Sequence, residues 1–333
     1  MNEKKLHMTL RELVIRHQND YGFDVSEAEK EPFRYGPPSL SIVIPYYQGR
    51  HLGITLASLY GAIAFVLQQE PNWDFEVIIV DDGSRVHASD VVNVSLFKKL
   101  KIRRLPQNKG RTAARNVGLF QARCDLVLFM DADILLTETI LMKHLCVHAF
   151  NSTSPCITVG LFSFIHEQDP IIASGLPTNG EAKEKLNDFR IHCIYQETWI
   201  GCEEDKRFVG REFFPVNETR EFRTWPSSGY LGPWILPNMV LGGFFMVRNE
   251  AARSVRGFDT TFLGYGFTET SLPTKLIAAF DHMVIPVQGN GCLHIEDAKA
   301  NISQSDKDRI FREKHAFYFK HYLALTLAEA LYA

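Results

Sequence analysis

Two kinds of segment alternate between residues 41 and 130. Short runs with the length and composition of strands are 41–45, 76–80, 102–105 and 126–130. Longer segments typical of helices are 51–68 and 112–122. Strands that are separated by helices pair in parallel through right-handed crossovers. We therefore predict an α/β fold in which helices flank a mostly parallel, twisted sheet.

Polar clusters directly follow three of the predicted strands. They are Tyr46–Tyr47, Asp81–Asp82 and Asp131–Asp133. Ligands of parallel sheets bind outside the carboxyl ends of the strands. The three clusters are therefore expected to meet at one edge of the sheet and to form a binding site there.

Asp131 and Asp133 follow five wholly apolar residues and enclose a single alanine. Taken alone, an Asp-x-Asp sequence is more often part of a surface turn or a helix cap. At the end of a buried strand, however, two carboxylates can reach one hard cation, and Mg²⁺ and Mn²⁺ prefer oxygen ligands that substrate phosphates often complete. The pair therefore suits a metal bound together with a diphosphate.

Asp82 has two interpretations, because Asp, Gly and Ser are also turn residues. It either belongs to a simple turn or accepts hydrogen bonds from a base or a ribose. Lys109, Arg111 and Arg115 are either solvated helix charges or donors to a diphosphate at the start of the predicted helix, where the helix N-terminus also attracts anions.

The second half of the chain is less regular. Residues 189–238 are rich in aromatic side chains. Among them, Trp225, Tyr230 and Trp234 form either a cleft or lid that binds an acceptor substrate or a second core layer. The apolar spacing in residues 5–20 predicts an amphipathic helix. We also predict a strand that begins with glycines at residues 242–248 and terminal helices in residues 303–333.

Composition narrows the class of partner. A net charge of -3 provides no basic field for nucleic acid or an anionic membrane, and no run approaches the roughly 20 apolar residues of a membrane helix. The 6 cysteines form no C-x-x-C pair, and no signal peptide begins the chain. We therefore expect a cytoplasmic protein with reduced thiols and no integral membrane segment.

Four ordered motifs carry a resemblance to a known family. They are residues 41–47, 80–84, 108–116 and 130–133. In order and approximate spacing they resemble the family 2 glycosyltransferases of the GT-A fold. The resemblance implies an inverting, metal-dependent hexosyltransferase that uses a nucleotide-sugar donor, with UDP the commoner base in the family.

The resemblance also implies roles for residues that bind the donor. Pro45, Tyr47 and Asp82 correspond to positions that contact the nucleoside, and Arg115 to one near the ribose or diphosphate. Asp131 corresponds to the carboxylate that binds the ribose beside the metal.

The metal site follows from the same resemblance. Asp133 corresponds to the carboxylate that binds Mn²⁺ or Mg²⁺ together with Asp131. His294 resembles a downstream histidine that completes the metal shell in some members, although a structural histidine is an equal alternative.

A last similarity lies in residues 257–269, which resemble the family's Gly-Phe-Asp followed by Gly-Trp-Gly-x-Glu-Asp. Here Tyr265 replaces Trp, Thr268 replaces Glu and Glu269 replaces the Asp that serves as general base. Glu269 is therefore the candidate base, and a substrate hydrogen-bond acceptor is its alternative role.

These inferences divide the chain into four parts: a helical extension (1–38), a nucleotide-sugar-binding half (39–150), an acceptor-binding half (151–300) and terminal helices (301–333). The acceptor could be a saccharide, a lipid-linked sugar, a natural product or a peptide. Two other functions stay open: an inactive nucleotide-sugar-binding partner subunit, and a sugar nucleotidyltransferase. The latter would need a Gly-rich basic loop after the first strand, where the chain has Pro45-Tyr46-Tyr47-Gln48-Gly49.

Overall fold

The structure is a computed structural model of the chain. It describes residues 3–17, 19, 28, 30, 33, 36–93, 97, 99–151, 155–174, 188, 193–201, 208–215, 236–264, 266–296 and 303–332. For residues 173–174, 193–201, 208–215, 288–291, 304 and 308 it describes the backbone alone.

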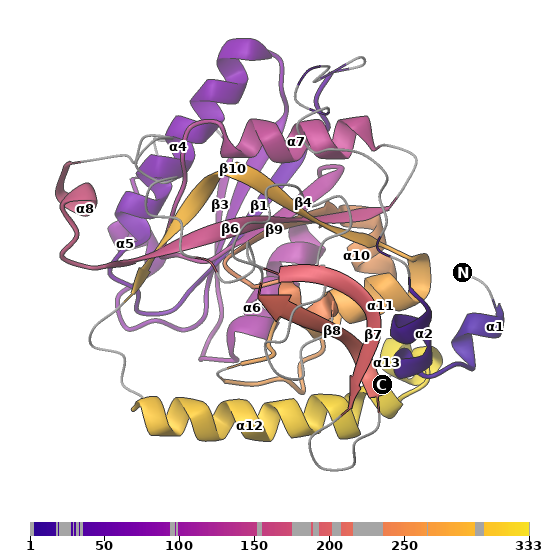
Figure 1. The fold of residues 1–333 in the computed structure, drawn as a ribbon. Coiled ribbons are helices and arrows are strands. Elements are labelled where there is room, and N and C mark those ends of the chain that lie inside the picture. Colours follow the sequence, from indigo (N-terminus) through magenta and orange to yellow (C-terminus); the bar gives the residue numbers. More distant parts are fainter. Residues whose placement is uncertain are drawn as a thin grey trace.

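An eight-stranded sheet forms the centre of the described part of the protein (Figure 1). In chain order its strands are β1 (Leu40–Tyr46), β2 (Phe75–Asp81), β3 (Leu100–Arg104), β4 (Leu126–Met130), β5 (Ile134–Leu135), β6 (Cys156–His166), β9 (Phe244–Arg248) and β10 (Met283–Glu296). Across the sheet their order is β3-β2-β1-β4-β9-β6-β10-β5. The strands β1 to β4 are parallel, as are β6 and β10, whereas β9 and β5 run antiparallel to their neighbours. The predicted mostly parallel α/β sheet is confirmed.

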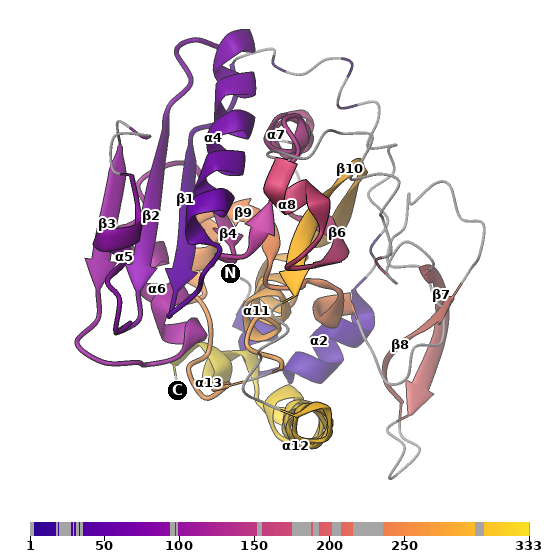
Figure 2. The same ribbon diagram turned by 90° about the vertical axis from the view of Figure 1, so that its left-hand side faces the viewer.

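Helices cover both faces of this sheet (Figures 1 and 2). The helices α4 (Leu52–Gln69) and α7 (Ile140–Phe150) share one hydrophobic cluster with Ile42 and Ile44 of β1. The helices α6 (Arg111–Gln121), α10 (Asn249–Ser254) and α11 (Ser271–Phe280) share another cluster with Val43. Successive residues of a strand point to opposite faces, so a strand covered on both sides must be apolar throughout. This is why the strands could be recognised as continuous apolar runs.

The remaining elements lie around this core. They are α1 (Glu3–Leu6), α2 (Leu10–Arg16), α5 (Ala88–Val91), α8 (Pro170–Ser174), β7 (Cys193–Gly201), β8 (Phe208–Pro215), η3 (Leu236–Met239), α12 (Gln304–Lys320), η4 (Tyr322–Ala324) and α13 (Leu327–Tyr332). The strands β7 and β8 form a separate antiparallel pair. The predicted helices near the C-terminus are confirmed.

The strand β9 connects the two predicted halves of the chain. It lies between β4 and β6 and pairs Met130 with Phe244, so residues from both halves share one sheet. The backbone N–H of Asp131 donates to the carbonyl of Gly243 at 3.0 Å. The end of β4, where the Asp-x-Asp sequence begins, is therefore held by a segment more than 100 positions later in the sequence.

The N-terminal segment differs from the single helix predicted for residues 5–20. It forms α1 and α2, separated at Thr9, whose hydroxyl accepts from the Glu12 N–H while the Glu12 carboxylate accepts from the Thr9 N–H. This capping box favours a new helix start at Thr9 and interrupts the longer helix. The N–H of Leu10 donates to Leu325, and the N–H of Leu327 donates to Met8, so the extension docks beside α13.

Among the described residues, α4 alone is long and apolar enough to cross a membrane by length and composition. The sequence analysis found no such run. In this structure Leu56, Leu59 and Ile63 of α4 are buried in the core cluster that includes β1 and α7. Its apolar composition is explained by packing against the sheet.

Three histidines, His144, His148 and His282, are buried in the core. His144 and His148 both contact the Thr158 hydroxyl, at 2.8 and 3.2 Å. Burial lowers the pKa of His148 to about 3 and that of His282 to about 4, and it also holds the pKa of His144 well below its ordinary value. Four described cysteines, Cys124, Cys146, Cys156 and Cys292, are buried thiols that form no disulfide among the described residues.

The buried histidines predict a loss of stability in mild acid. The unfolded chain takes up protons near pH 6.5, whereas folded His148 and His282 do so only near their lowered pKa values, so stability falls as the pH drops below 6.5. Between pH 7 and 5 the loss should be about 2 kcal/mol for each of these two histidines. Urea unfolding at both pH values measures it. His148→Gln should flatten the dependence, whereas exposed His7→Gln should not; an equal slope in both variants would contradict the assignment.

Candidate functional site

A cleft of about 820 Å³ opens at the carboxyl ends of β1, β2 and β4. The predicted donor-side residues that line it are Pro45, Tyr47, Asp82, Lys109, Arg111, Asp131 and Asp133. Residues that the sequence analysis did not single out are Arg50, His51, Gln107, Leu263 and Gly264. The expectation that the three polar clusters meet at one edge of the sheet is confirmed.

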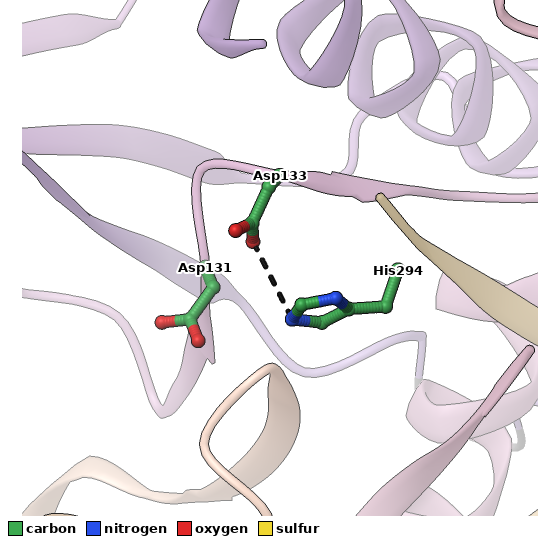
Figure 3. A group of neighbouring side chains, drawn as sticks. All are labelled: Asp131, Asp133 and His294. Carbon is green, nitrogen blue, oxygen red and sulfur yellow. Dashed lines mark ion pairs between the residues drawn. The ribbon is translucent and has the colours of Figure 1, made fainter. Parts of the chain in front are cut away.

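Asp131, Asp133 and His294 come together at this edge (Figure 3). One potential ligand atom from each lies within 4.8 Å of the others, and His294 Nε2 is 3.7 Å from Asp133 Oδ1. The short strand β5 pairs His294 with Ile134, and the N–H of Ile295 donates to the Asp133 carbonyl at 3.0 Å. Backbone pairing thus places a histidine beside a carboxylate that lies 161 positions earlier.

The donor set fits a divalent cation. Asp133 Oδ1 is a buried oxygen atom without a hydrogen-bond partner among the described residues, although the whole side chain is 41% exposed. Two carboxylates and an imidazole are ligands that Mn²⁺ and Mg²⁺ sites accept, carboxylates being the preferred ones. Burial raises the pKa of Asp133, although the nearby His294 imidazole acts in the opposite direction. A cation would supply the partner that this carboxylate lacks.

Arg115 is a fully buried guanidinium between two carboxylates. Its Nη2 donates to Asp131 Oδ1 at 2.8 Å and to the Gly242 carbonyl at 3.0 Å, and its Nη1 lies 3.8 Å from Glu269 Oε2. Although burial opposes it, the charges of Arg115 and Arg111 hold the pKa of Asp131 below its usual range.

The burial of Arg115 bears on its predicted role. Its side chain is 0% exposed and does not line the cleft, so in this structure it cannot contact a ribose or diphosphate directly. Instead it orients Asp131 and Glu269 relative to each other. Gly242 makes room for it, because a Cβ at that position would lie 2.3 Å from Arg115 Nη2.

Asp82 fastens the loop that precedes α6. Its two oxygens accept from the backbone N–H groups of Lys109 and Gly110, at 2.7 and 2.9 Å. Gly110 has φ 89°, a left-handed conformation that favours glycine. Burial raises the pKa of Asp82. The carboxylate therefore has a turn-stabilising role at the wall of the cleft, and base or ribose contact stays a prediction.

Arg111 begins α6 with its side chain half-exposed above the cleft. Its Nη1 lies 3.9 Å from Asp131 Oδ2. Lys109 lines the cleft just before this helix. Two cationic side chains and the N–H groups of a helix start therefore face the same space, an arrangement suited to an anion.

Glu269 lies in a smaller neighbouring pocket of about 190 Å³ that shares Arg111 with the cleft. The Glu269 side chain is 17% exposed, and its Oε2 accepts from the Thr268 hydroxyl at 2.6 Å. Thr268, which departs from the family pattern, thus orients the candidate base. This role of Thr268 was not predicted from the sequence, although its position directly before Glu269 was the available signal.

The predicted acceptor residues Trp225, Tyr230 and Trp234 lie outside the described residues, so their assignment stays a prediction. The structure instead brings Phe311 and His315 of α12 into the pocket of Glu269. Their spacing of four residues on a helix was the available signal.

The chain is similar in sequence to known glycosyltransferases. Residues 41–158 match the family model of glycosyl transferase family 2. The uncharacterized glycosyltransferase YfnE of Bacillus subtilis is 29% identical over 293 residues, which are 79% of this chain and 68% of that protein. Human dolichyl-phosphate beta-glucosyltransferase is 29% identical over 127 residues, 35% of this chain and 39% of that enzyme.

A solved structure of GalNAc-T7 with UDP, GalNAc and Mn²⁺ is similar in fold. The TM-score is 0.53 at 16% sequence identity, and the similarity covers 86% of this chain and 51% of that one. It supports the GT-A fold that the sequence motifs implied, and at this identity it concerns the fold alone.

Proposed function

We propose that the chain transfers a sugar from a nucleotide-diphosphate sugar to a hydroxyl acceptor with inversion. The match of residues 41–158 to the model of glycosyl transferase family 2 supports this proposal. The observation that carries this proposal is the convergence of Asp131, Asp133 and His294 at a cleft that basic residues also line. A UDP-sugar is the proposed donor, and Mn²⁺ or Mg²⁺ the proposed metal. The cytoplasm is the proposed site of action.

The donor side needs a group that neutralises the departing diphosphate. Asp131, Asp133 and His294 would hold the cation, which when bound supplies Lewis-acid stabilisation of the leaving group. Arg111 and Lys109 add positive charge at the start of α6, where the diphosphate is bound. Arg115 keeps the Asp131 carboxylate aimed at this site by a 2.8 Å charged hydrogen bond.

The acceptor side needs a base. The oxygen of the acceptor hydroxyl attacks the anomeric carbon of the donor sugar, and the hydroxyl proton passes to Glu269. The bond from that carbon to the diphosphate oxygen breaks, and its electron pair leaves with the diphosphate. Attack opposite the leaving group inverts the configuration at that carbon.

A second candidate function is a nucleotide-sugar-binding subunit without activity. Thr268 and Glu269 depart from the family pattern, and an inactive nucleotide-sugar-binding subunit would tolerate such changes. The hydrogen bond from Thr268 to Glu269 supports the active enzyme, because it positions a carboxylate where a base is needed. The cleft has no Gly-rich basic loop after β1, which disfavours a sugar nucleotidyltransferase.

Release of UDP from UDP-sugars tests the proposal. Purified protein is incubated with a panel of UDP-sugars and Mn²⁺, and with EDTA in a parallel sample. Slow release that requires the metal supports a transferase. Metal-dependent binding of UDP without any release or transfer from the panel would instead favour the inactive subunit.

His294→Gln should weaken Mn²⁺ binding at least roughly tenfold, because losing even an outer-shell partner of a metal ligand costs about 10–100-fold in affinity. Calorimetric titration with Mn²⁺ measures this change. Exposed His166 on the neighbouring strand β6 provides the matched control, His166→Gln. Equal affinity in both variants would leave His294 a structural residue that packs between Phe162 and Phe164.

A further inference from the structure

The helix α12 carries a row of aromatic side chains toward the turn that bears Glu269. Phe311, His315 and Tyr318 follow one another at helical spacing and therefore share one face. All three contact the ring of Phe267, with ring centroids 5.3, 6.0 and 5.3 Å away. Figure 1 shows α12 as a long helix along one side of the molecule, away from the sheet, and Figure 2 shows the same helix end-on.

These contacts hold an unusual turn. Phe267 has φ 58°, a left-handed conformation that costs a bulky residue free energy and persists only where the surroundings impose it. The aromatic face of α12 provides those surroundings, and the Tyr318 hydroxyl is fixed in turn by Thr274 at 2.8 Å. Because Glu269 lies two residues after Phe267, its position depends on α12.

The same helix also helps to line the pocket of Glu269. Described residues from four parts of the chain meet there: Arg111 of α6, Asn238 and Leu241 near η3, Gly266–Thr270, and Phe311 and His315 of α12. At about 190 Å³ it is much smaller than the 820 Å³ cleft beside it. It is closer to the size of a single ring than to that of an extended chain.

We propose that this pocket binds a neutral sugar ring of the acceptor, and that Phe311 and His315 of α12 select which ring is accepted. The inference rests on the proposed sugar-transfer function. A pyranose has apolar C–H faces that pack on aromatic rings and a rim of hydroxyls for polar partners. Glu269 favours a ligand with a hydroxyl donor, since an apolar ring would desolvate this carboxylate without supplying a hydrogen bond.

Saturation-transfer NMR tests ligand binding without requiring turnover. The probes are methyl β-glucopyranoside, methyl β-galactopyranoside and methyl N-acetyl-β-glucosaminide, with acetyl-serinamide and tyrosinamide as non-sugar hydroxyl compounds, all in the presence of UDP and Mn²⁺. We expect at least one glycoside to bind and the two non-sugar compounds not to bind. Phe311→Ala should weaken glycoside binding roughly tenfold, from the loss of one aromatic contact and its buried area.

Phe317→Ala is the matched control, because it removes the same ring from the same helix at a position 37% exposed and outside both pockets. It should bind the glycoside like the unchanged protein. If Phe311→Ala unfolds, Phe311→Leu decides the question, since it keeps apolar volume and removes only the ring.

The outcomes separate this inference from the proposed function. Equal glycoside affinity in the Phe311 and Phe317 variants, or binding of the non-sugar compounds alone, would overturn the assignment of the pocket even if the unchanged protein releases UDP from a UDP-sugar. Absence of metal-dependent UDP release from every donor would instead overturn the proposed function, and the acceptor assignment with it.

Discussion

Replacement of Asp133 by asparagine is expected to reduce metal-dependent sugar transfer by at least about 10³-fold, because the cation that stabilises the leaving diphosphate is worth several kcal/mol in the transition state. The amide keeps the shape of the side chain but loses the negative charge. Among the residues that the structure describes, Asp133 Oδ1 has no hydrogen-bond partner, so folding should be nearly unaffected. The loss should therefore appear in turnover and in Mn²⁺ affinity, and not in the unfolding temperature.

The measurement is release of UDP at saturating donor, together with calorimetric titration of Mn²⁺. Exposed Glu138, five residues along the chain, provides the control Glu138→Gln, which should behave like the unchanged protein. Normal Mn²⁺ affinity in Asp133→Asn would remove this residue from the metal site. Reduced affinity with full activity would show that the reaction does not need the metal.

Glu269→Gln is expected to lower the rate of transfer by about 10²–10⁴-fold while leaving Mn²⁺ and UDP affinity nearly unchanged. Glutamine is almost identical in shape to glutamate. In the unchanged protein the Thr268 hydroxyl donates to Glu269 Oε2 at 2.6 Å, and the side-chain oxygen of glutamine can accept the same hydrogen bond. The substitution removes the ability to take up a proton and the negative charge that faces Arg115 Nη1 at 3.8 Å. The effect should therefore fall on kcat and not on donor binding.

Pre-steady-state transfer to an acceptor, with UDP affinity measured separately, checks this expectation. Glu250→Gln, in the exposed first turn of α10, is the control for loss of a carboxylate. A Glu269→Asp variant adds information, because shortening the side chain by one methylene tests whether the reach of the longer acid matters. Normal turnover in Glu269→Gln would leave this residue a substrate hydrogen-bond acceptor.

Much of the fold could be predicted from the sequence because the central strands are buried on both faces. The run 126–130 is apolar throughout, and the run 41–45 is apolar after Ser41. The structure has the first as β4 and extends the second by one residue at each end to form β1. The N-terminal helix was predicted too long, since the capping box at Thr9 was a local signal that the apolar periodicity of residues 5–20 concealed.

The candidate site was predictable in part, for a different reason. Residues after parallel strands meet at one edge whatever else the chain does, so the cleft residues Tyr47, Asp82 and Asp131 could be grouped in advance. The role of Arg115 could not. Its guanidinium lies between Asp131 and Glu269 because Gly242, in the turn before β9, leaves room for it.

The sequence by itself determined the α/β layering and the edge of the sheet where Asp131 and Asp133 lie. Apolar periodicity and the succession of strands and helices along the chain are encoded locally. Tertiary structure alone decided which distant residues join them. His294 reaches Asp133 through the pairing of β10 with β5, and Phe311 reaches the pocket of Glu269 through packing of α12 on Phe267. Such contacts depend on long-range register and packing, which no local pattern of residues specifies.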